Sequence, residues 1–226
     1  GARTGMASWL ADGGSGGVAE YLPADSLLAG YVSMREPWQL FQEFTALMME
    51  HEESFESSLA ELDETLGPGF LADLTAALGS EAAFALSGFS VNGPAWAMVA
   101  LAYNPVVIDR SLQTFVDAFN AALPPDEQDR RVVLEQESAG GRVWNSLRAG
   151  NLPFGVTWTY DGGYMVAASD RATAERAIAT RNGGSALVWS PEFVDRLPTS
   201  AGIHASAFAW LNTKGAFDMF STIAPN

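Results

Sequence analysis

The chain has 226 residues and a formal net charge of −15 at pH 7, from 27 acidic and 12 basic residues. A hydrophobic content of 48% is that of a globular protein, and the absence of cysteine excludes thiol catalysis, cysteine-ligated metals and disulfide bonds. The negative charge repels phosphate backbones, so we expect no nucleic-acid partner.

The acidic charge is concentrated in one region. Between Arg35 and Arg110 there is no Lys or Arg, while the same 74 residues hold twelve Asp or Glu. Residues 1–109 carry 15 acidic against 2 basic residues (−13), and residues 110–226 carry 12 against 10 (−2). Such a region favours cations or basic partners.

The chain begins with a segment rich in small residues. Residues 1–17 contain a glycine-rich stretch at 12–17 and lack the basic start and long apolar run of a signal peptide. We predict a flexible linker over residues 1–20, followed by a single domain over residues 21–226. The longest apolar stretches, such as residues 95–103, are about half a membrane span, so we expect no transmembrane segment.

The first half of the domain predicts both element types. Residues 27–34 are typical of a strand, and Pro37 opens a run without Gly or Pro that ends at Gly67. Apolar residues recur through this run at helical spacing, at Phe41, Phe44, Met48, Phe55, Leu59, Leu62 and Leu66. The run predicts one long or two consecutive amphipathic helices, with a shorter helix over residues 70–78 behind it.

A hairpin and a third helix are expected next. Residues 81–89 and 95–103 are apolar, and Asn92-Gly93 between them favours a tight turn. Pro105 then starts a helix that ends before Pro124.

The second half predicts a meander followed by smaller elements. Four strands are expected, over residues 132–137, 142–148, 154–160 and 164–169. They are followed by a helix over 171–180 capped by Asp170, a short helix near 191–197, a strand over 203–211 and a helix over 213–223. Hairpins and helices interleave without regular alternation. We therefore predict an α+β fold, with a mainly antiparallel sheet of about 7–8 strands and helices packed on one face.

One pattern recurs along the chain. Leu22-Pro23 precedes a strand and a helix with Phe41 and Phe44, and Leu197-Pro198 precedes a strand and a helix with Phe217 and Phe220. Two interpretations fit the pattern. One is a duplication, in which the chain is cut from a longer protein with a second repeat starting near residue 197. The other is chance similarity of two strand-helix units.

Several motifs carry a family resemblance. They are residues 22–28 (LPADSLL), 66–68 (LGP), 161–169 (DGGYMVAAS) and 174–178 (AERAI). Over residues 22–197 the chain resembles an uncharacterised family of bacterial exported or membrane-anchored proteins with a Leu-Pro-Ala-Asp strand signature. The resemblance implies an extracytoplasmic location, in the periplasm or cell envelope, and a longer precursor, but no activity or cofactor. The unusually acidic first helix departs from the family pattern.

The two histidines do not form a metal motif. A zinc-protease helix needs a second His four residues after the first, but the residue at that distance from His51 is Phe55. His51 instead lies on the apolar seam of the predicted helix, where a packing role is expected. His204 lies in the predicted strand over 203–211, where we expect a hydrogen-bonded core or edge histidine.

Carboxylates cluster around His51. Glu50, Glu53 and Glu56 are weak candidates for calcium ligands on the exposed side of the predicted helix, because calcium binds six to eight oxygen atoms. Straight helices rarely surround one ion, so a basic protein partner or a solvated surface are the other interpretations. The interaction surface predicted here comprises Glu50, His51, Glu52, Glu53 and Glu56.

Glu135 and Glu137 share one face of a predicted strand, as a glycosidase carboxylate pair does. Closure of the turn over 138–141 sets Glu137 opposite Arg142 and Glu135 opposite Trp144, and this predicts ordinary cross-strand pairs. We therefore assign no catalytic residue.

Three functional hypotheses remain. The first is a non-enzymatic cell-envelope module that binds a protein or a small apolar ligand through the sheet or the acidic helix. The second is a hydrolase that relies on carboxylates, which requires two acids converging in a cleft. The third is a structural part of a larger envelope protein.

Six tryptophans suit a sugar or lipid site or the core, namely Trp38, Trp96, Trp144, Trp158, Trp189 and Trp210. We expect no cofactor.

Overall fold

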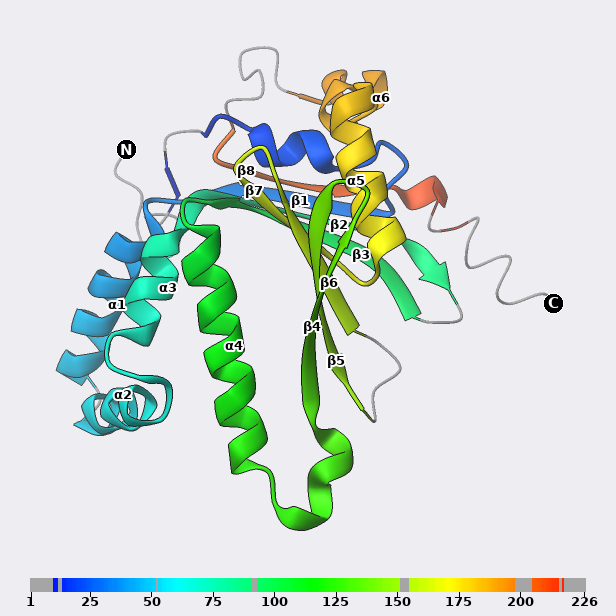
Figure 1. Ribbon diagram of the computed structural model, residues 1–226. Helices are drawn as coiled ribbons and strands as arrows, with labels where there is room; N and C mark the ends of the chain where they lie inside the picture. Colours follow the sequence, from blue (N-terminus) through cyan, green and yellow to red (C-terminus); the bar gives the residue numbers. More distant parts are fainter. Residues whose placement is uncertain are drawn as a thin grey trace.

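The computed structural model describes residues 10–11, 14–51, 53–90, 93–150, 155–197, 205–215 and 217. Within these ranges the side chains of residues 47–48, 50–51, 53–56, 58–59 and 90 lie outside the description. The described strands form one eight-stranded antiparallel sheet in the order β4-β5-β6-β7-β3-β2-β1-β8 (Figure 1). The predicted α+β fold with a mainly antiparallel sheet is thereby confirmed.

The strands follow the predicted runs closely. They are β1 (Leu28–Ser33), β2 (Leu78–Ser90), β3 (Gly93–Ala102), β4 (Val132–Ala139), β5 (Arg142–Ala149), β6 (Gly155–Asp161), β7 (Tyr164–Ala168) and β8 (Ala207–Leu211). The predicted hairpin joins β2 to β3, with Ser90 opposite Gly93. Its turn residue Asn92 and the start of the last predicted strand, including His204, lie outside the described residues.

The helices also begin where the sequence indicated. They are α1 (Pro37–His51), α2 (Glu53–Leu66), α3 (Phe70–Ala77), α4 (Pro105–Ala122), α5 (Arg171–Gly183) and α6 (Pro191–Val194). Asp170 caps α5 as predicted, because its side chain accepts a hydrogen bond from Thr173 N. Three short 3-10 helices were not predicted, η2 (Gly17–Tyr21), η3 (Pro125–Arg130) and η4 (Leu187–Trp189).

Helices lie on both faces of the sheet, whereas the sequence analysis placed them on one. In Figure 1, α5, α6 and η2 lie on one side of the sheet, and α3 and α4 on the other. The reason is the composition of β2, β3 and β7, which are apolar at consecutive positions. Because side chains alternate across a strand, such runs present apolar groups on both faces.

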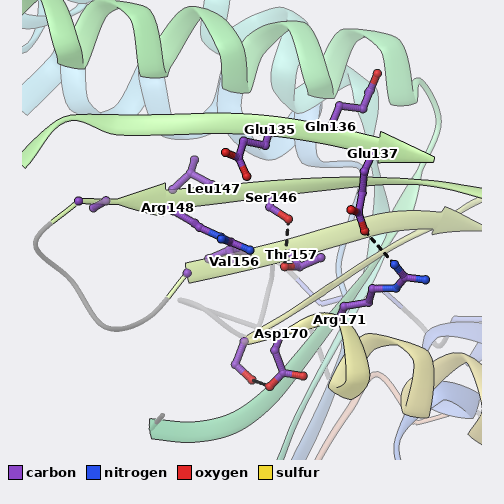
Figure 2. A pocket seen from close by; sticks show the side chains of 14 residues that line it. Glu135, Gln136, Glu137, Ser146, Leu147, Arg148, Val156, Thr157, Asp170 and Arg171 are labelled. Carbon is purple, nitrogen blue, oxygen red and sulfur yellow. Dashed lines mark hydrogen bonds and ion pairs between the residues drawn. The ribbon is translucent and has the colours of Figure 1, made fainter. Parts of the chain in front are cut away.

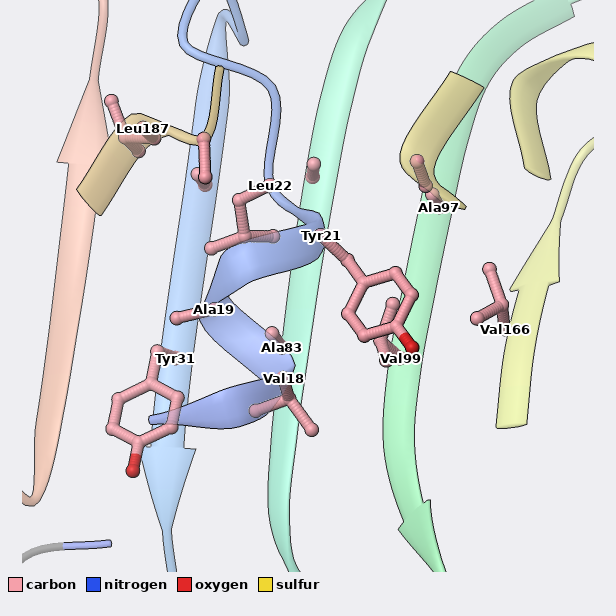
Figure 3. Packing of buried hydrophobic residues seen from close by; sticks show 14 of the residues in the cluster. Val18, Ala19, Tyr21, Leu22, Tyr31, Ala83, Ala97, Val99, Val166 and Leu187 are labelled. Atoms are coloured by element: carbon pink, nitrogen blue, oxygen red, sulfur yellow. The ribbon is translucent and has the colours of Figure 1, made fainter. Parts of the chain in front are cut away.

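The main core lies on the side of η2 and α5, which we call the covered face. Ala83 and Ala85 of β2, Ala97 and Val99 of β3, and Val166 of β7 project from the sheet here and are buried. η2 packs against β2 and β3, and Figure 3 shows its Tyr21 ring close to Val99 of β3. The sheet side chains are small, and this lets the backbone of η2 approach closely.

Packing of η2 corrects the predicted N-terminal linker. Val18 and Ala19 are fully buried, and Tyr21 and Leu22 are nearly so. The backbone amide of Ser15 donates to the Glu81 carboxylate, and Gly16 N lies 3.2 Å from the same oxygen. A flexible linker up to residue 20 is therefore wrong for residues 14–20, whose apolar and amide groups are bound by the core.

The second core is smaller and lies under α3 and α4. Ala77, Ala102 and Ile108 are its buried members. Asp109 of α4 accepts hydrogen bonds from Trp158 Nε1 at 3.0 Å and from the Tyr160 hydroxyl at 2.7 Å. Burial and the neighbouring Asp109 raise the pKa of Tyr160. These contacts fix α4 against the outer half of the sheet.

Candidate functional site

The most unusual surface of the molecule lies on the sheet face opposite η2, over strands β8, β1, β2 and β3. The registers place twelve residues there in three cross-strand rows. The rows are Leu211, Leu28, Leu86 and Trp96; Ala209, Gly30, Phe84 and Met98; and Ala207, Val32, Ala82 and Ala100. The rows contain no charged residue and no Ser, Thr, Asn or Gln. We call these twelve residues the open patch.

Several large side chains of the open patch are exposed to solvent. Leu28 is 40% exposed, Phe84 38%, Met98 43% and Leu211 56%. Exposed apolar residues are normal when scattered, but a contiguous apolar area on one face of a sheet is typical of an interaction site. The open patch is therefore the strongest candidate for a binding surface in the described part of the chain.

The two faces of the same strands explain this distribution. On β2, Ala83 and Ala85 face η2 and are buried, while Phe84 between them faces the open patch. The covered face needs small side chains because η2 lies close to it. The large apolar side chains alternate to the other face, where α4 contacts the outer strand β4 and α3 contacts β2.

A second apolar surface lies between α2 and α4. A groove of about 350 Å³ is lined by Leu62, Leu66, Phe115 and Phe119, with Ala118, Ala122, Glu61 and Thr65. Phe115 is 52% exposed. Its lining includes one carboxylate, that of Glu61.

A polar hollow of about 920 Å³ lies over β4, β5 and β6, on the covered face (Figure 2). Its floor includes Ser146 and Thr157, whose hydroxyl oxygens are 3.4 Å apart. The side chains of Glu135, Glu137, Arg148 and Asp170 also line it, together with Arg171 at the start of α5.

The hollow contains the carboxylate pair that the sequence singled out. Glu137 pairs with Arg171 Nη1 at 2.8 Å, as Figure 2 shows, and its side chain is 63% exposed. General-acid chemistry by a carboxyl group requires burial or a like-charged neighbour. The surroundings of Glu137 supply a cation and solvent instead.

The predicted partners of these two residues were wrong. Glu137 lies opposite Trp144 and Glu135 opposite Ser146, whereas Arg142 lies opposite Ala139. The turn consists of Gly140 and Gly141 alone, with φ angles of 61° and 75°. Glycines adopt positive φ at both central positions of a two-residue hairpin turn, so the register moves by two residues from the predicted one.

The acidic segment divides between two helices. Glu50 and His51 end α1, and Glu53 and Glu56 lie in α2. The predicted alternative of two consecutive helices is therefore confirmed, and the carboxylates do not share one helix. Glu52 and the side chains of the other four residues lie outside the described part of the chain. No group of three or more metal-ligating side chains occurs among the residues that the structure does describe.

The tryptophans divide between core and surface. Trp144, Trp158 and Trp210 are 1%, 2% and 7% exposed and belong to the cores. The Arg171 guanidinium lies 5.0 Å from the centre of the Trp144 ring. Trp96 lies in the open patch, and Trp38 and Trp189 are exposed. The six residues therefore do not gather into one aromatic site.

The Leu-Pro-Ala-Asp motif has a structural role. Leu22 is buried, its carbonyl accepts a hydrogen bond from Leu187 N at 2.7 Å, and Pro23 bridges to Ala186. Asp25 forms an ion pair with Arg176 of α5 at 2.5 Å. The motif thus joins β1 to the segments on the covered face.

A polar cluster lies beside this motif. The Tyr21 hydroxyl donates to Asp161 Oδ2 at 2.8 Å and accepts from Arg181 Nη1 at 2.5 Å. Burial raises the pKa of Tyr21, Asp161 raises it further, and Arg181 lowers it. Arg142 also pairs with Asp161, at 2.7 Å. The side chains of Tyr21, Asp161, Arg181 and Arg142 thus form hydrogen bonds or ion pairs within the cluster. These interactions hold η2, α5 and the end of β6 together.

Sequence reasoning named the sheet as one possible binding surface but did not identify the residues of the open patch. Its signal was present, because residues 81–89 and 95–103 are nearly continuous apolar runs without strict alternation. Such runs indicate strands that are apolar on both faces. They do not indicate which of the two faces the remaining helices cover.

Among the described residues, no helix is both long and apolar enough to cross a membrane. Comparison with known proteins finds no matching family model, no matching curated protein and no matching solved structure. The site must therefore be interpreted from its own geometry.

Proposed function

We propose that the chain is a non-enzymatic binding module that recognises an apolar partner through the open patch. The observation that carries the proposal is the set of three uninterrupted apolar rows across four strands, with Phe84 and Met98 exposed in the middle row. Burial of apolar surface stabilises a complex by about 25 cal/mol per Å². A partner that covers these rows is therefore bound favourably without any charged contact.

The partner class follows from the chemistry of the patch. A twelve-residue surface without a charged side chain offers no ionic contact to a phosphate or a metal ion. It suits an apolar protein surface or a small apolar ligand, and the net charge of −15 adds a preference for partners that are not acidic.

The location of the module is proposed as the bacterial cell envelope. Support comes from the resemblance of the 22–28 and 161–169 motifs to exported or membrane-anchored proteins. Protease treatment of intact and lysed cells that make the protein naturally tests this. Cleavage only after lysis with inner-membrane disruption would contradict it.

A carboxylate-dependent hydrolase is the alternative, and the hollow with Glu135 and Glu137 is its only supporting observation within the described residues. The ion pair of Glu137 with Arg171 argues against a general acid there. A structural role in a larger envelope protein is compatible with the open patch, which such a protein would cover.

Binding of the uncharged dye Nile red tests the proposal directly. We expect enhanced, blue-shifted emission with the wild-type chain, and at least a several-fold loss of affinity in Met98→Gln. Met49→Gln is the matched control, because Met49 on α1 is 48% exposed against 43% for Met98. An equal loss in both variants, or no emission change with the wild type, would overturn the proposed site.

A further inference from the structure

Strand β8 lies at one edge of the described sheet, at the border of the open patch. The strand order ends with β8, and no other described residue pairs with its outer edge. Ser33 N donates to Ser206 O at 2.7 Å, and Asn212 N donates to Leu27 O at 2.9 Å. Because bonding alternates along an antiparallel strand, the backbone groups of Ala207, Ala209 and Leu211 point away from β1.

The two edges of the sheet differ in how they are protected. Strand β4, at the opposite edge, carries Glu135 and Glu137, and charged side chains are a common defence against strand addition. Strand β8 has the sequence Ala-Phe-Ala-Trp-Leu, without charge, proline or glycine. An apolar edge of this kind is a template for pairing with another strand.

We propose that β8 pairs with β8 of a second copy of this chain, antiparallel about a two-fold axis at Ala209. This inference deepens the proposed function and rests on it, because the paired sheets join two open patches into one apolar surface. The pairing extends the sheet sideways and leaves Phe84 and Met98 uncovered.

The register of this pairing follows from the positions of the outward groups. Ala207, Ala209 and Leu211 are spaced symmetrically about Ala209, so only the register centred there uses all three. Ala207 of one copy then lies opposite Leu211 of the other, and Ala209 lies opposite itself. Each such pair exchanges two backbone hydrogen bonds.

Side chains on both faces are compatible with this register. On the patch side a small residue lies opposite a large one, Ala207 against Leu211. On the covered face Phe208 of one copy lies opposite Trp210 of the other, and aromatic cross-strand pairs stabilise sheets. In the single chain Phe208 already stacks on Tyr31 of β1, with ring centroids 5.6 Å apart.

Charge does not oppose the contact locally, although each chain carries −15. The described charges flanking β8 are mixed. Arg196 lies 4.9 Å from the Trp210 ring centre and Lys214 follows the strand, while Glu192 and Asp195 are the acids of the α6 segment. The acidic residues of α1 and α2 belong to other elements, and at physiological salt charges are screened beyond about 8 Å.

A cysteine cross-link tests the register, since the chain has no cysteine of its own. In Ala209→Cys the two thiols lie on the axis, with Cα atoms about 5.5 Å apart, which is within disulfide range. In Ala207→Cys, the matched control, they are separated by four residues along the strands, about 13 Å. We expect a disulfide-linked dimer under mild oxidation from Ala209→Cys and not from Ala207→Cys. Equal cross-linking of the two, or none in a folded Ala209→Cys, would overturn the proposal.

Sedimentation equilibrium tests the assembly itself, from about 1 µM to 1 mM chain, a range that covers weak and moderate dimers. We expect a dimer for the wild type and a monomer for Ala209→Pro, whose missing N–H points away from β1 and is tolerated at an edge. A wild type that stays monomeric throughout would refute the pairing. The two proposals fail separately, since Met98→Gln should lose Nile red binding and still dimerise, whereas wild-type chain diluted until it is monomeric should still bind Nile red.

Discussion

The two faces of the central strands differ, because one face forms the core of the fold and the other is exposed to solvent. On the covered face, Ala83, Ala85 and Ala97 are buried beneath η2. On the other face the same strands carry Phe84 and Met98, which remain 38% and 43% exposed. On these strands the small side chains are buried and the large apolar side chains are exposed, which is the reverse of an ordinary core. Small residues are buried because the covering backbone is close, and large ones are free for a partner.

Truncation of one leucine on each side is expected to give the largest contrast. Leu22→Ala removes a side chain that is 1% exposed and should lower the free energy of unfolding by about 2–5 kcal/mol. Leu28→Ala, at 40% exposure in the open patch, should cost less than about 1 kcal/mol. Urea denaturation of both variants measures this. Similar losses would show that the open patch is not solvent-exposed in solution.

Enlargement of neighbouring alanines on β2 sharpens the same comparison. Ala83→Leu pushes a larger side chain against η2 and should destabilise the fold by about 1–3 kcal/mol. Ala82→Leu points to the other face and should change stability by less than about 0.5 kcal/mol. Thermal unfolding at neutral pH separates the two, and a reversed order would mean that η2 does not pack where the structure places it.

Each side also contains a tyrosine whose pKa is raised, Tyr21 under the covered face and Tyr160 against α4. Because the folded state holds these protons more tightly than the unfolded state, stability is fully present below about pH 10, the unfolded value. It falls as the pH rises above that value, by about 1.4 kcal/mol per pH unit for each group.

Between pH 10 and 12 the free energy of unfolding falls with pH. Tyr160→Phe and Tyr21→Phe should each make this slope shallower by about 1.4 kcal/mol per pH unit. At neutral pH each should cost about 0.5–1.5 kcal/mol through the lost hydrogen bond. Denaturant titrations across this pH range measure both effects. If the slope is unchanged in Tyr160→Phe, the hydroxyl is not buried beside Asp109.

The sequence by itself determined most of the elements. Pro37 and Pro105 mark the starts of α1 and α4, because proline fits the first turn of a helix. Asp170 caps α5, and the meander from β4 to β7 follows the predicted runs. These features depend on local rules, such as helix capping, turn residues and apolar spacing, which act over a few residues.

Contacts between distant segments decided the rest. Residues 14–20 have a linker composition, yet the core holds them because Glu81 accepts their backbone amides and Val18 and Ala19 fill space above β2. The register of β4 and β5 depended on which glycines form the turn. In these places a long-range contact or a two-residue choice outweighed local composition.

The candidate site belongs to this second group. The apolar runs of β2 and β3 are visible in the sequence, but the placement of β8 beside β1 and of η2 on the opposite face is not. Strand order depends on which strands pair during folding. An apolar strand is compatible with several different neighbours, so its sequence does not specify one order. Only the tertiary structure decides that the large side chains of these strands face outward next to β8, the strand at the edge of the described sheet.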